Sequence, residues 1–359
     1  MIKLKPIPLL PFAIIMTIAA LSLTMLYSIS GGSFSPWCIK QIWRVLLGVA
    51  ALIVAMNIKT EIWRKYALAI YMMSLVTLAL VAVIGKISMG AQRWIKFGAL
   101  TLQPSELMRI SLVILLARYF STRSVDENKC AKALLVPTLI TTIPVGFVLL
   151  QPDLGTAMLI ILTFLSVLFV CGVEIWKFVT IFISALISVP ILWKCLYEYQ
   201  KQRILMFLNP EMDPSGAGYH IIQAKIALGS GGFWGKGLLN GTQIQLDFLP
   251  EKQTDFIFVA LGEELGFIGC TLLLFLYVML FIYNYKVVLF TRSKFTRIMV
   301  FGINAMIFFY VIINILMVCG LFPVVGIPLP FFSYGGNALL VIMFSQGIIF
   351  AADCEQSKK

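Results

Sequence analysis

Long apolar runs separated by short polar segments make up most of the chain. Ten of these runs approach the roughly 20 residues that a helix needs to cross the hydrocarbon core of a bilayer. They lie at 9–29, 40–57, 66–85, 105–121, 132–150, 154–172, 175–193, 256–283, 298–319 and 336–352. The pattern predicts an all-α polytopic membrane protein, a bundle of about ten transmembrane helices that forms a single domain over 1–359. Because charge or glycine interrupts several runs, nine and eleven spans remain alternatives.

One connection, 194–255, is long enough to build a structure of its own. It contains an expected short helix between Tyr219 and Leu228, then the glycine cluster GSGGFWGKG, and it ends in FLPEKQTD directly before the eighth run. A shorter loop, 86–104, joins the third and fourth runs. We therefore expect the polar chemistry of this protein to lie mainly in one large loop.

Composition agrees with lipid as the solvent. The chain is 60% hydrophobic and 12% charged, whereas soluble domains average about 45–50% apolar and about 25% charged residues. The first run follows Lys3 and Lys5 as a signal peptide would, but no small-residue cleavage site comes after it. We interpret it as a retained first helix.

The charge distribution predicts an orientation. The net charge is +12, but basic and aromatic residues do not alternate on a polar scaffold, so we expect no nucleic-acid partner. If both termini are cytoplasmic, 16 of the 28 basic residues fall on short cytoplasmic connections, whereas 194–255 carries six basic and six acidic residues. The positive-inside rule then predicts a multi-pass protein of the cytoplasmic membrane, with both termini inside and the large loop outside.

Asp255 stands where the large loop meets the eighth run, at the expected outer interface. An acid at this position is typical of a helix start, where it caps the helix and complements its dipole. Gly262, Gly266 and Gly269 lie near the same helical face and would let another helix approach closely. A structural cap and a functional carboxylate at the mouth of a pocket are both compatible with this position.

Two further groups of charges fall inside predicted spans. Glu263 and Glu264 lie about 12 Å deeper than Asp255, where acids are costly unless protonated, paired or facing water. They either hold loop backbone and neighbouring helices, which we favour, or take part in catalysis. Glu106 and Arg109, three residues apart in QPSELMR, can pair on one helix face. They form either a neutralised pair or the lining of a substrate cavity.

Other motifs have structural explanations. GSGGFWGKG lacks the first glycine and the final Ser or Thr of a phosphate-binding loop, so a flexible loop is the better interpretation. Lys225, Lys236 and Arg203 could still meet an anionic head group. The run PVVGIPLPFFSYGGNALL predicts irregular backbone before the last span, which lipid permits only if protein buries it or it lines water. Asp153 is expected to cap the following helix. Seven cysteines without CxxC and a single histidine exclude multi-histidine metal sites.

Together the motifs resemble a known family. GAQRWI, QPSEL, QPDLGT, GAGYHIIQAKIALGSGG, GKGLLNGTQ, FLPEKQTDFIF, EELG and PLPFFSYGG occur in this order across essentially the whole chain. They are similar to the SEDS family of shape, elongation, division and sporulation proteins. The short tails and the GTQIQLDFLPE stretch resemble its lateral-wall elongation branch more than its division branch.

The resemblance implies a peptidoglycan glycosyltransferase that polymerises lipid II during cell-wall elongation. It also implies a partner, a class B penicillin-binding protein that acts as transpeptidase, besides other elongation-complex proteins and membrane lipids. The family's essential aspartate corresponds to Asp255. Its cavity pair, usually Glu and Lys, corresponds to Glu106 and Arg109, so the charge is kept while the donor geometry differs. Asn337 stands where Ser is commoner.

A mechanism follows as a hypothesis. Asp255 would take the proton of the acceptor hydroxyl during one inverting displacement. A pyrophosphate leaves as an anion and needs positive charge, from Arg93, Lys96, Arg203, Lys225 or a divalent cation such as Mg or Mn. We expect no organic cofactor. The alternatives are a lipid II flippase, which could use the same groove, and a non-catalytic scaffold for the transpeptidase.

Overall fold

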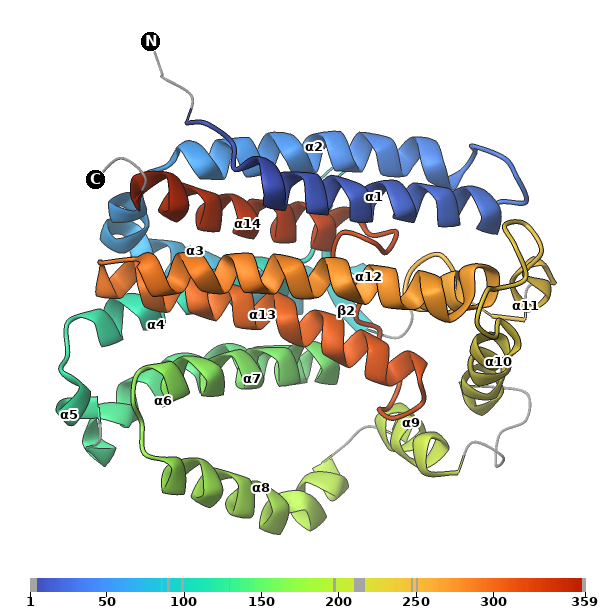
Figure 1. The fold of residues 1–359 in the computed structure, drawn as a ribbon. Coiled ribbons are helices and arrows are strands. Elements are labelled where there is room, and N and C mark those ends of the chain that lie inside the picture. The colour runs from blue at the N-terminus through green and yellow to red at the C-terminus, as the bar shows by residue number, and fades with distance from the viewer. Residues whose placement is uncertain are drawn as a thin grey trace.

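The computed structural model describes residues 5–84, 86–88, 91–97, 100–128, 130–195, 198–209, 217–246, 248–249 and 251–356. Its long helices run alongside one another in one bundle (Figure 1). They are α1 (Leu9–Ile29), α2 (Trp37–Asn57), α3 (Thr60–Ile84), α4 (Pro104–Ser121), α6 (Ala131–Leu150), α7 (Leu154–Val170), α8 (Ile175–Cys195), α12 (Ile257–Phe290), α13 (Lys294–Val318) and α14 (Gly336–Gln356). Shorter helices are α5 (Val125–Asn128), α9 (Glu198–Leu208), α10 (Ala217–Ser230) and α11 (Thr242–Gln245).

Each predicted span overlaps one long helix. Among the described residues, seven helices are long and apolar enough to cross a membrane, and α7 and α8 supply shorter apolar stretches. The predicted all-α polytopic membrane fold is confirmed, and the chain is an integral membrane protein. The boundaries of the spans within a bilayer stay a prediction. The expected helix between Tyr219 and Leu228 lies within α10.

The loop at 86–104 contains a small sheet that the apolar pattern did not indicate. Strands β1 (Lys86–Ser88), β2 (Ala91–Phe97) and β3 (Leu100–Leu102) pair antiparallel in that order. Lys86 faces Trp94, and Ile95 faces Leu102. β1 and β3, with three residues each, give too few alternating positions for a sequence pattern to reveal them, and the seven residues of β2, AQRWIKF, do not alternate strictly between apolar and polar.

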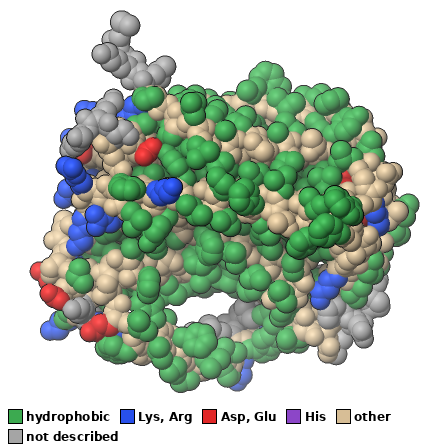
Figure 2. Space-filling view, in the orientation of Figure 1, with side chains coloured by type: hydrophobic (Ala, Val, Ile, Leu, Met, Phe, Trp, Pro, Cys, Tyr) green, Lys and Arg blue, Asp and Glu red, His purple; other side chains and the backbone are tan. Residues whose placement is uncertain are grey.

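The bundle buries an apolar core and presents apolar side chains outward. α14 packs along α2, α3 packs along α4, and α13 contacts α4, α7 and α12. Exposed side chains such as Leu46, Met73 and Phe275 cover the outer faces. Figure 2 shows this apolar surface over the middle of the bundle, with Lys and Arg gathered mainly at the end that holds both termini. Such a surface fits lipid as the surrounding medium.

Helix α12 is broken near its start, and the glycine cluster fills the break. Gly266 has φ 64° and ψ −159°, which interrupts the helical backbone. The amides of Lys236 and Gly237 donate to the carbonyls of Glu263 (3.0 Å) and Glu264 (2.9 Å), which the break leaves without helical partners. From the other side, Phe267 N donates to Gly232 O at 2.9 Å. The loop therefore completes the hydrogen bonding of α12.

This contact corrects the expected flexible loop. A Cβ on Gly231 would lie 2.0 Å from Gly262 O, and one on Gly235 would lie 2.1 Å from Glu264 O. Only glycine lets two backbones approach so closely. The cluster is therefore a packing surface rather than a flexible linker, and it places the large loop firmly against α12.

Loops fall into two sets at opposite ends of the bundle. Both termini and the α2–α3, α4–α6 and α12–α13 connections lie at one end, where Lys5 pairs with Glu355 and Lys294 donates to Arg123 O. α9, α10 and α11 lie at the other end (Figure 1). This second end also holds Asp255.

Candidate active site

Asp255 ends the large loop directly before α12 and is half-buried. Its backbone carbonyl accepts a hydrogen bond from Asn314 Nδ2 at 3.1 Å, and the same amide group donates to Ile327 O at 2.7 Å. One side chain of α13 therefore holds both the loop before α12 and the irregular segment before α14. The carboxylate faces that segment, because a Cβ on exposed Gly326 would lie 3.4 Å from Asp255 Oδ2.

The surroundings of Asp255 suit a base. Burial, and then the nearby negative charge of Glu251, raise the pKa of Asp255 to about 6, while Arg203 acts to lower it. A carboxyl group with this pKa is about 90% ionised at pH 7, yet it binds a proton far better than an ordinary aspartate. These properties favour general-base chemistry near neutral pH.

Within the irregular segment 319–335, the stretch from Ile327 to Ser333 is largely buried in protein, whereas Leu321 and Gly326 are exposed. Lipid tolerates such backbone where protein buries it or where it lines a wet cavity. Ser333 Oγ donates to Thr254 O and accepts from Leu329 N, each at 2.7 Å, and Tyr334 N donates to Gln253 O at 2.9 Å. The segment therefore forms a fixed wall beside Asp255.

Two cations flank the same wall. Arg203 on α9 donates through Nη1 to Val324 O at 3.1 Å. Lys225 on α10 lies across Gly320, where its Nζ would be 2.7 Å from a Cβ at that position. Both side chains are exposed, and Arg203 also lines a cavity of about 250 Å³ with residues such as Gln200, Phe322 and Val325. An anion beside Asp255 would thus meet positive charge.

Glu106 and Arg109 form a buried pair inside the bundle. Arg109 Nη2 pairs with Glu106 Oε1, and Tyr310 OH on α13 donates to Glu106 Oε2 at 2.6 Å. The guanidinium also lies over the Tyr310 ring, 4.5 Å from its centroid. Glu106 is 4% exposed and Arg109 2%. The arrangement is that of a neutralised pair, and a role of these two side chains in lining a substrate cavity stays a prediction.

Tyr310→Phe tests how much this buried cluster contributes to the stability of the fold. The substitution leaves a buried carboxylate oxygen without its donor, and a hydrogen bond to a charged group contributes about 1.5–3 kcal/mol. We expect the unfolding free energy of the purified protein in detergent to fall by about 2 kcal/mol. Tyr285→Phe, an exposed tyrosine on α12, is the matched control and should change it little. Equal effects of the two variants would contradict the proposed contribution.

Glu263 and Glu264 hold the large loop. Glu263 Oε1 accepts from Lys236 Nζ at 2.7 Å and from Gln243 N at 3.0 Å. Glu264 Oε1 accepts from Ser28 Oγ of α1 at 2.5 Å. Both carboxylates are fully buried. These contacts tie α12, the loop and α1 together, which is a structural role.

Comparison with known proteins places the chain in a family. The cell cycle protein model FtsW, RodA and SpoVE matches residues 8–358. Peptidoglycan glycosyltransferase MrdB of Escherichia coli (strain K12) is 41% identical over 317 residues, which cover 87% of this chain and 84% of MrdB. A probable peptidoglycan glycosyltransferase FtsW of Trichlorobacter lovleyi is 34% identical over 351 residues, 96% of this chain and 90% of that protein. This chain belongs to the FtsW, RodA and SpoVE family of cell cycle proteins.

Solved structures agree with the family assignment. A chain from the study "Structural coordination of polymerization and crosslinking by a peptidoglycan synthase complex" matches with a TM-score of 0.85 at 28% identity, covering 97% of this chain and 98% of that one. The crystal structure of the Rod shape determining protein RodA of Thermus thermophilus matches with a TM-score of 0.71 at 26% identity, covering 96% and 95%. The predicted family and the predicted enzyme class, peptidoglycan glycosyltransferase, are confirmed.

Within this family fold, the residues proposed from the sequence separate into three groups. Asp255, Arg203 and Lys225 surround the segment 319–335 at one end of the bundle. Glu263 and Glu264 lie at the same end but face the loop, whereas Glu106 and Arg109 lie inside the bundle. Arg93 and Lys96 lie on β2, and their side chains fall outside the described residues.

Two residues of α13 that contact the proposed site residues were not predicted from the sequence. Tyr310 and Asn314 stand four residues apart, so they share one helix face. Tyr310 contacts Glu106, and Asn314 holds the backbone of Asp255. One helix thus links the buried pair to the candidate site. The available signal was an asparagine and a tyrosine inside an apolar span, where polar groups need partners.

Proposed function

We propose that this protein polymerises lipid II into glycan strands and that Asp255 is the general base. The main support is the carboxylate of Asp255, which is half-buried and has a pKa of about 6. It lies at the loop–helix junction beside the segment 319–335 and two exposed cations, Arg203 and Lys225. Its relatives carry the name peptidoglycan glycosyltransferase. A base, a nearby anion site and an apolar bundle together suit a lipid-linked sugar substrate.

The reaction is one displacement at the anomeric carbon. The acceptor hydroxyl oxygen forms the new glycosidic bond as its proton passes to the Asp255 carboxylate. The bond from the anomeric carbon to the pyrophosphate oxygen breaks, and the electron pair leaves with the polyprenyl pyrophosphate. In this proposal, Arg203 and Lys225 stabilise that charge. Arg93 and Lys96 stay predicted contributors.

A divalent cation remains part of the proposal, but the described residues provide no cage for it. Nowhere among them do three His, Cys, Asp or Glu side chains come together to hold a metal ion. Any Mg or Mn would therefore be held chiefly by the substrate's phosphates, as Mg often is. The steps assigned to Asp255, Arg203 and Lys225 do not depend on it.

The proposed orientation puts Asp255 outside the cytoplasmic membrane and both termini inside. Support comes from the opposite placement of the two loop sets and from the basic side chains at the terminal end (Figure 2). Short basic loops stay on the cytoplasmic side. The extracytoplasmic end would then receive lipid II that has already been flipped.

We also propose a class B penicillin-binding protein as partner, within a larger elongation complex. The support is the 0.85 match to a chain from a peptidoglycan synthase complex described as coordinating polymerisation and crosslinking. Transpeptidation of new strands would follow directly where they emerge.

Lipid II conversion in detergent tests this function against its rivals. Purified protein with its transpeptidase partner should form polymer from lipid II in micelles, where no second compartment exists. A flippase predicts labelled lipid movement across vesicles without polymer. A scaffold predicts that the assembled complex forms polymer only when another polymerase is added. Absence of polymer from folded, fully assembled complex would overturn the proposal.

The pH dependence of this assay gives a sharper test. Because the ionised carboxylate is the base, the rate should rise through pH about 6 and level off above about pH 7. Glu251→Gln removes a charge that raises the pKa of Asp255, so the rise should move to lower pH. Arg203→Gln removes a charge that lowers it, so the rise should move to higher pH. Profiles with an unchanged midpoint in both variants would contradict Asp255 as the titrating base.

A further inference from the structure

A second cavity opens at the end of the bundle that holds both termini, opposite Asp255. Its volume is about 650 Å³. Its walls come from four parts of the chain: the N-terminal segment with Lys5, the start of α3 at Thr60, the α12–α13 connection with Arg292, and the end of α14 with Glu355. Nothing in the proposed reaction uses it.

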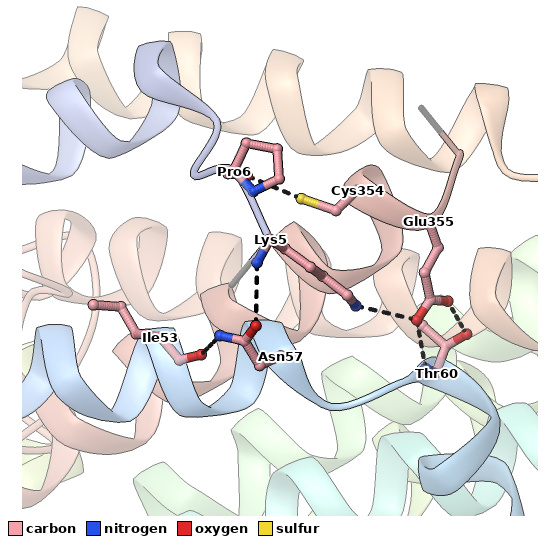
Figure 3. Close-up of polar contacts among 7 residues, drawn as sticks. All are labelled: Lys5, Pro6, Ile53, Asn57, Thr60, Cys354 and Glu355. Atoms are coloured by element: carbon pink, nitrogen blue, oxygen red, sulfur yellow. Dashed lines mark hydrogen bonds and ion pairs between the residues drawn. The ribbon is translucent and has the colours of Figure 1, made fainter. Parts of the chain in front are cut away.

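Three lining residues of this cavity, Lys5, Thr60 and Glu355, belong to one hydrogen-bond network (Figure 3). Glu355 Oε1 accepts from Thr60 N at 3.1 Å and from Lys5 Nζ at 3.3 Å, and Oε2 accepts from Thr60 Oγ1 at 2.6 Å. Lys5 N also donates to Asn57 Oδ1 at 3.2 Å, and Cys354 Sγ donates to Pro6 O at 3.2 Å. The network fixes the N-terminal segment against α14 and neutralises Glu355 inside the wall.

The rest of the lining carries two cations, Lys59 and Arg292, that take no part in this network. Lys59 and Arg292 are exposed, and within the described part of the chain neither makes an ion pair or a side-chain hydrogen bond. Glu61 is the other acid of the lining. Three cations against two acids give 3 − 2 = +1, and pairing Lys5 with Glu355 leaves the excess on Lys59 and Arg292.

The cavity lies where helices leave the apolar region. α3 begins at Thr60, α12 ends at Phe290 and α14 ends at Gln356. Phe290 lines the cavity and is 73% exposed, so an apolar surface borders the cations. With the predicted spans, this level is that of the lipid head groups, where basic pockets between transmembrane helices bind anionic lipids.

We propose that this cavity binds the head group of an anionic phospholipid, with its phosphate between Lys59 and Arg292 and its acyl chains along Phe290. A phosphodiester carries one negative charge, which matches the net charge of the lining. The inference rests on the position of the cavity in a membrane protein and is independent of the proposed reaction.

Lipid retention measured by native mass spectrometry tests this site. Full-length protein would be titrated in detergent with dioleoyl phosphatidylglycerol and, separately, with dioleoyl phosphatidylcholine. The wild type should retain phosphatidylglycerol preferentially, and Lys59→Gln/Arg292→Gln should lower its apparent affinity at least about tenfold. The matched control, Arg64→Gln/Lys286→Gln, removes the same charge from exposed helix positions outside the cavity. It should keep the preference.

Several outcomes would overturn the proposal. An equal loss in the control pair would show bulk charge rather than a pocket, and no preference in the wild type would remove the site. Displacement of the lipid by sn-glycerol 3-phosphate at equal concentration would assign the cavity to a soluble phosphate. The unfolding midpoints of all variants, measured in phosphatidylcholine alone, show whether each variant is folded. The single variants Lys59→Gln and Arg292→Gln then show whether the loss of lipid binding follows the loss of each charge. Polymerisation of lipid II is a different readout, so failure here leaves the proposed reaction untouched.

Discussion

Asp255→Asn is expected to abolish glycan polymerisation while the protein still folds and assembles. Asparagine has nearly the same shape but cannot take the proton of the acceptor hydroxyl, and general-base catalysis contributes about 10²- to 10⁴-fold to a rate. The backbone carbonyl at this position still accepts the hydrogen bond from Asn314. The purified complex should therefore keep its elution profile and its transpeptidase partner and lose polymer formation by at least about 10²-fold.

Glu251→Gln is the matched control for this loss of charge. Glu251 lies four residues before Asp255 in the same loop, is exposed, and influences Asp255 through its charge. At pH 8, Asp255 is ionised in both the wild type and Glu251→Gln, so the polymerisation rate of this variant should stay within a few-fold of the wild-type rate. Normal polymerisation by Asp255→Asn, or an equal loss in both variants, would remove Asp255 from the role of base.

Gly235→Ala is expected to destabilise the protein strongly. Gly235 has φ 81°, and a Cβ there would lie 2.1 Å from Glu264 O and 2.7 Å from Gly266 N. These obstacles are backbone atoms at the break in α12, so they cannot rotate away. Left-handed backbone costs about 1–2 kcal/mol for alanine, and overpacking adds about 1–3 kcal/mol. We expect the unfolding free energy in detergent to fall by about 3 kcal/mol.

Gly229→Ala provides the comparison within the same glycine cluster. Gly229 lies in α10, and a Cβ there would meet nothing within 4 Å. Alanine is the better helix former by up to about 1 kcal/mol, so this variant should unfold at the same or a slightly higher free energy. Similar destabilisation by both substitutions would mean that the close contact with α12 is not what the cluster provides.

The transmembrane helices could be predicted because crossing a membrane is a local problem. Each backbone amide in lipid must be satisfied within its own segment, so a run such as 9–29 becomes a helix, here α1 (Leu9–Ile29), whatever its neighbours. The position of Asp255 between a polar loop and an apolar run left a helix cap and a functional carboxylate both open. The resemblance of the surrounding motif to the family singled it out. The expected cap at Asp153 is likewise local, and its side chain accepts from Thr156 N.

The tertiary structure decided what surrounds those residues. The position of Asp255 beside Gly326, and the hydrogen bond of Tyr310 to Glu106 across 204 positions, join segments far apart in the chain. The break at Gly266 occurs inside an apolar run, and its freed carbonyls are satisfied by the amides of Lys236 and Gly237. The apolar pattern along this chain therefore determined its helices, and the motif around Asp255 pointed to its aspartate. Only packing decided which loop fills the broken helix and which cations flank the base, because those contacts depend on shape and hydrogen bonding between segments that no local pattern contains.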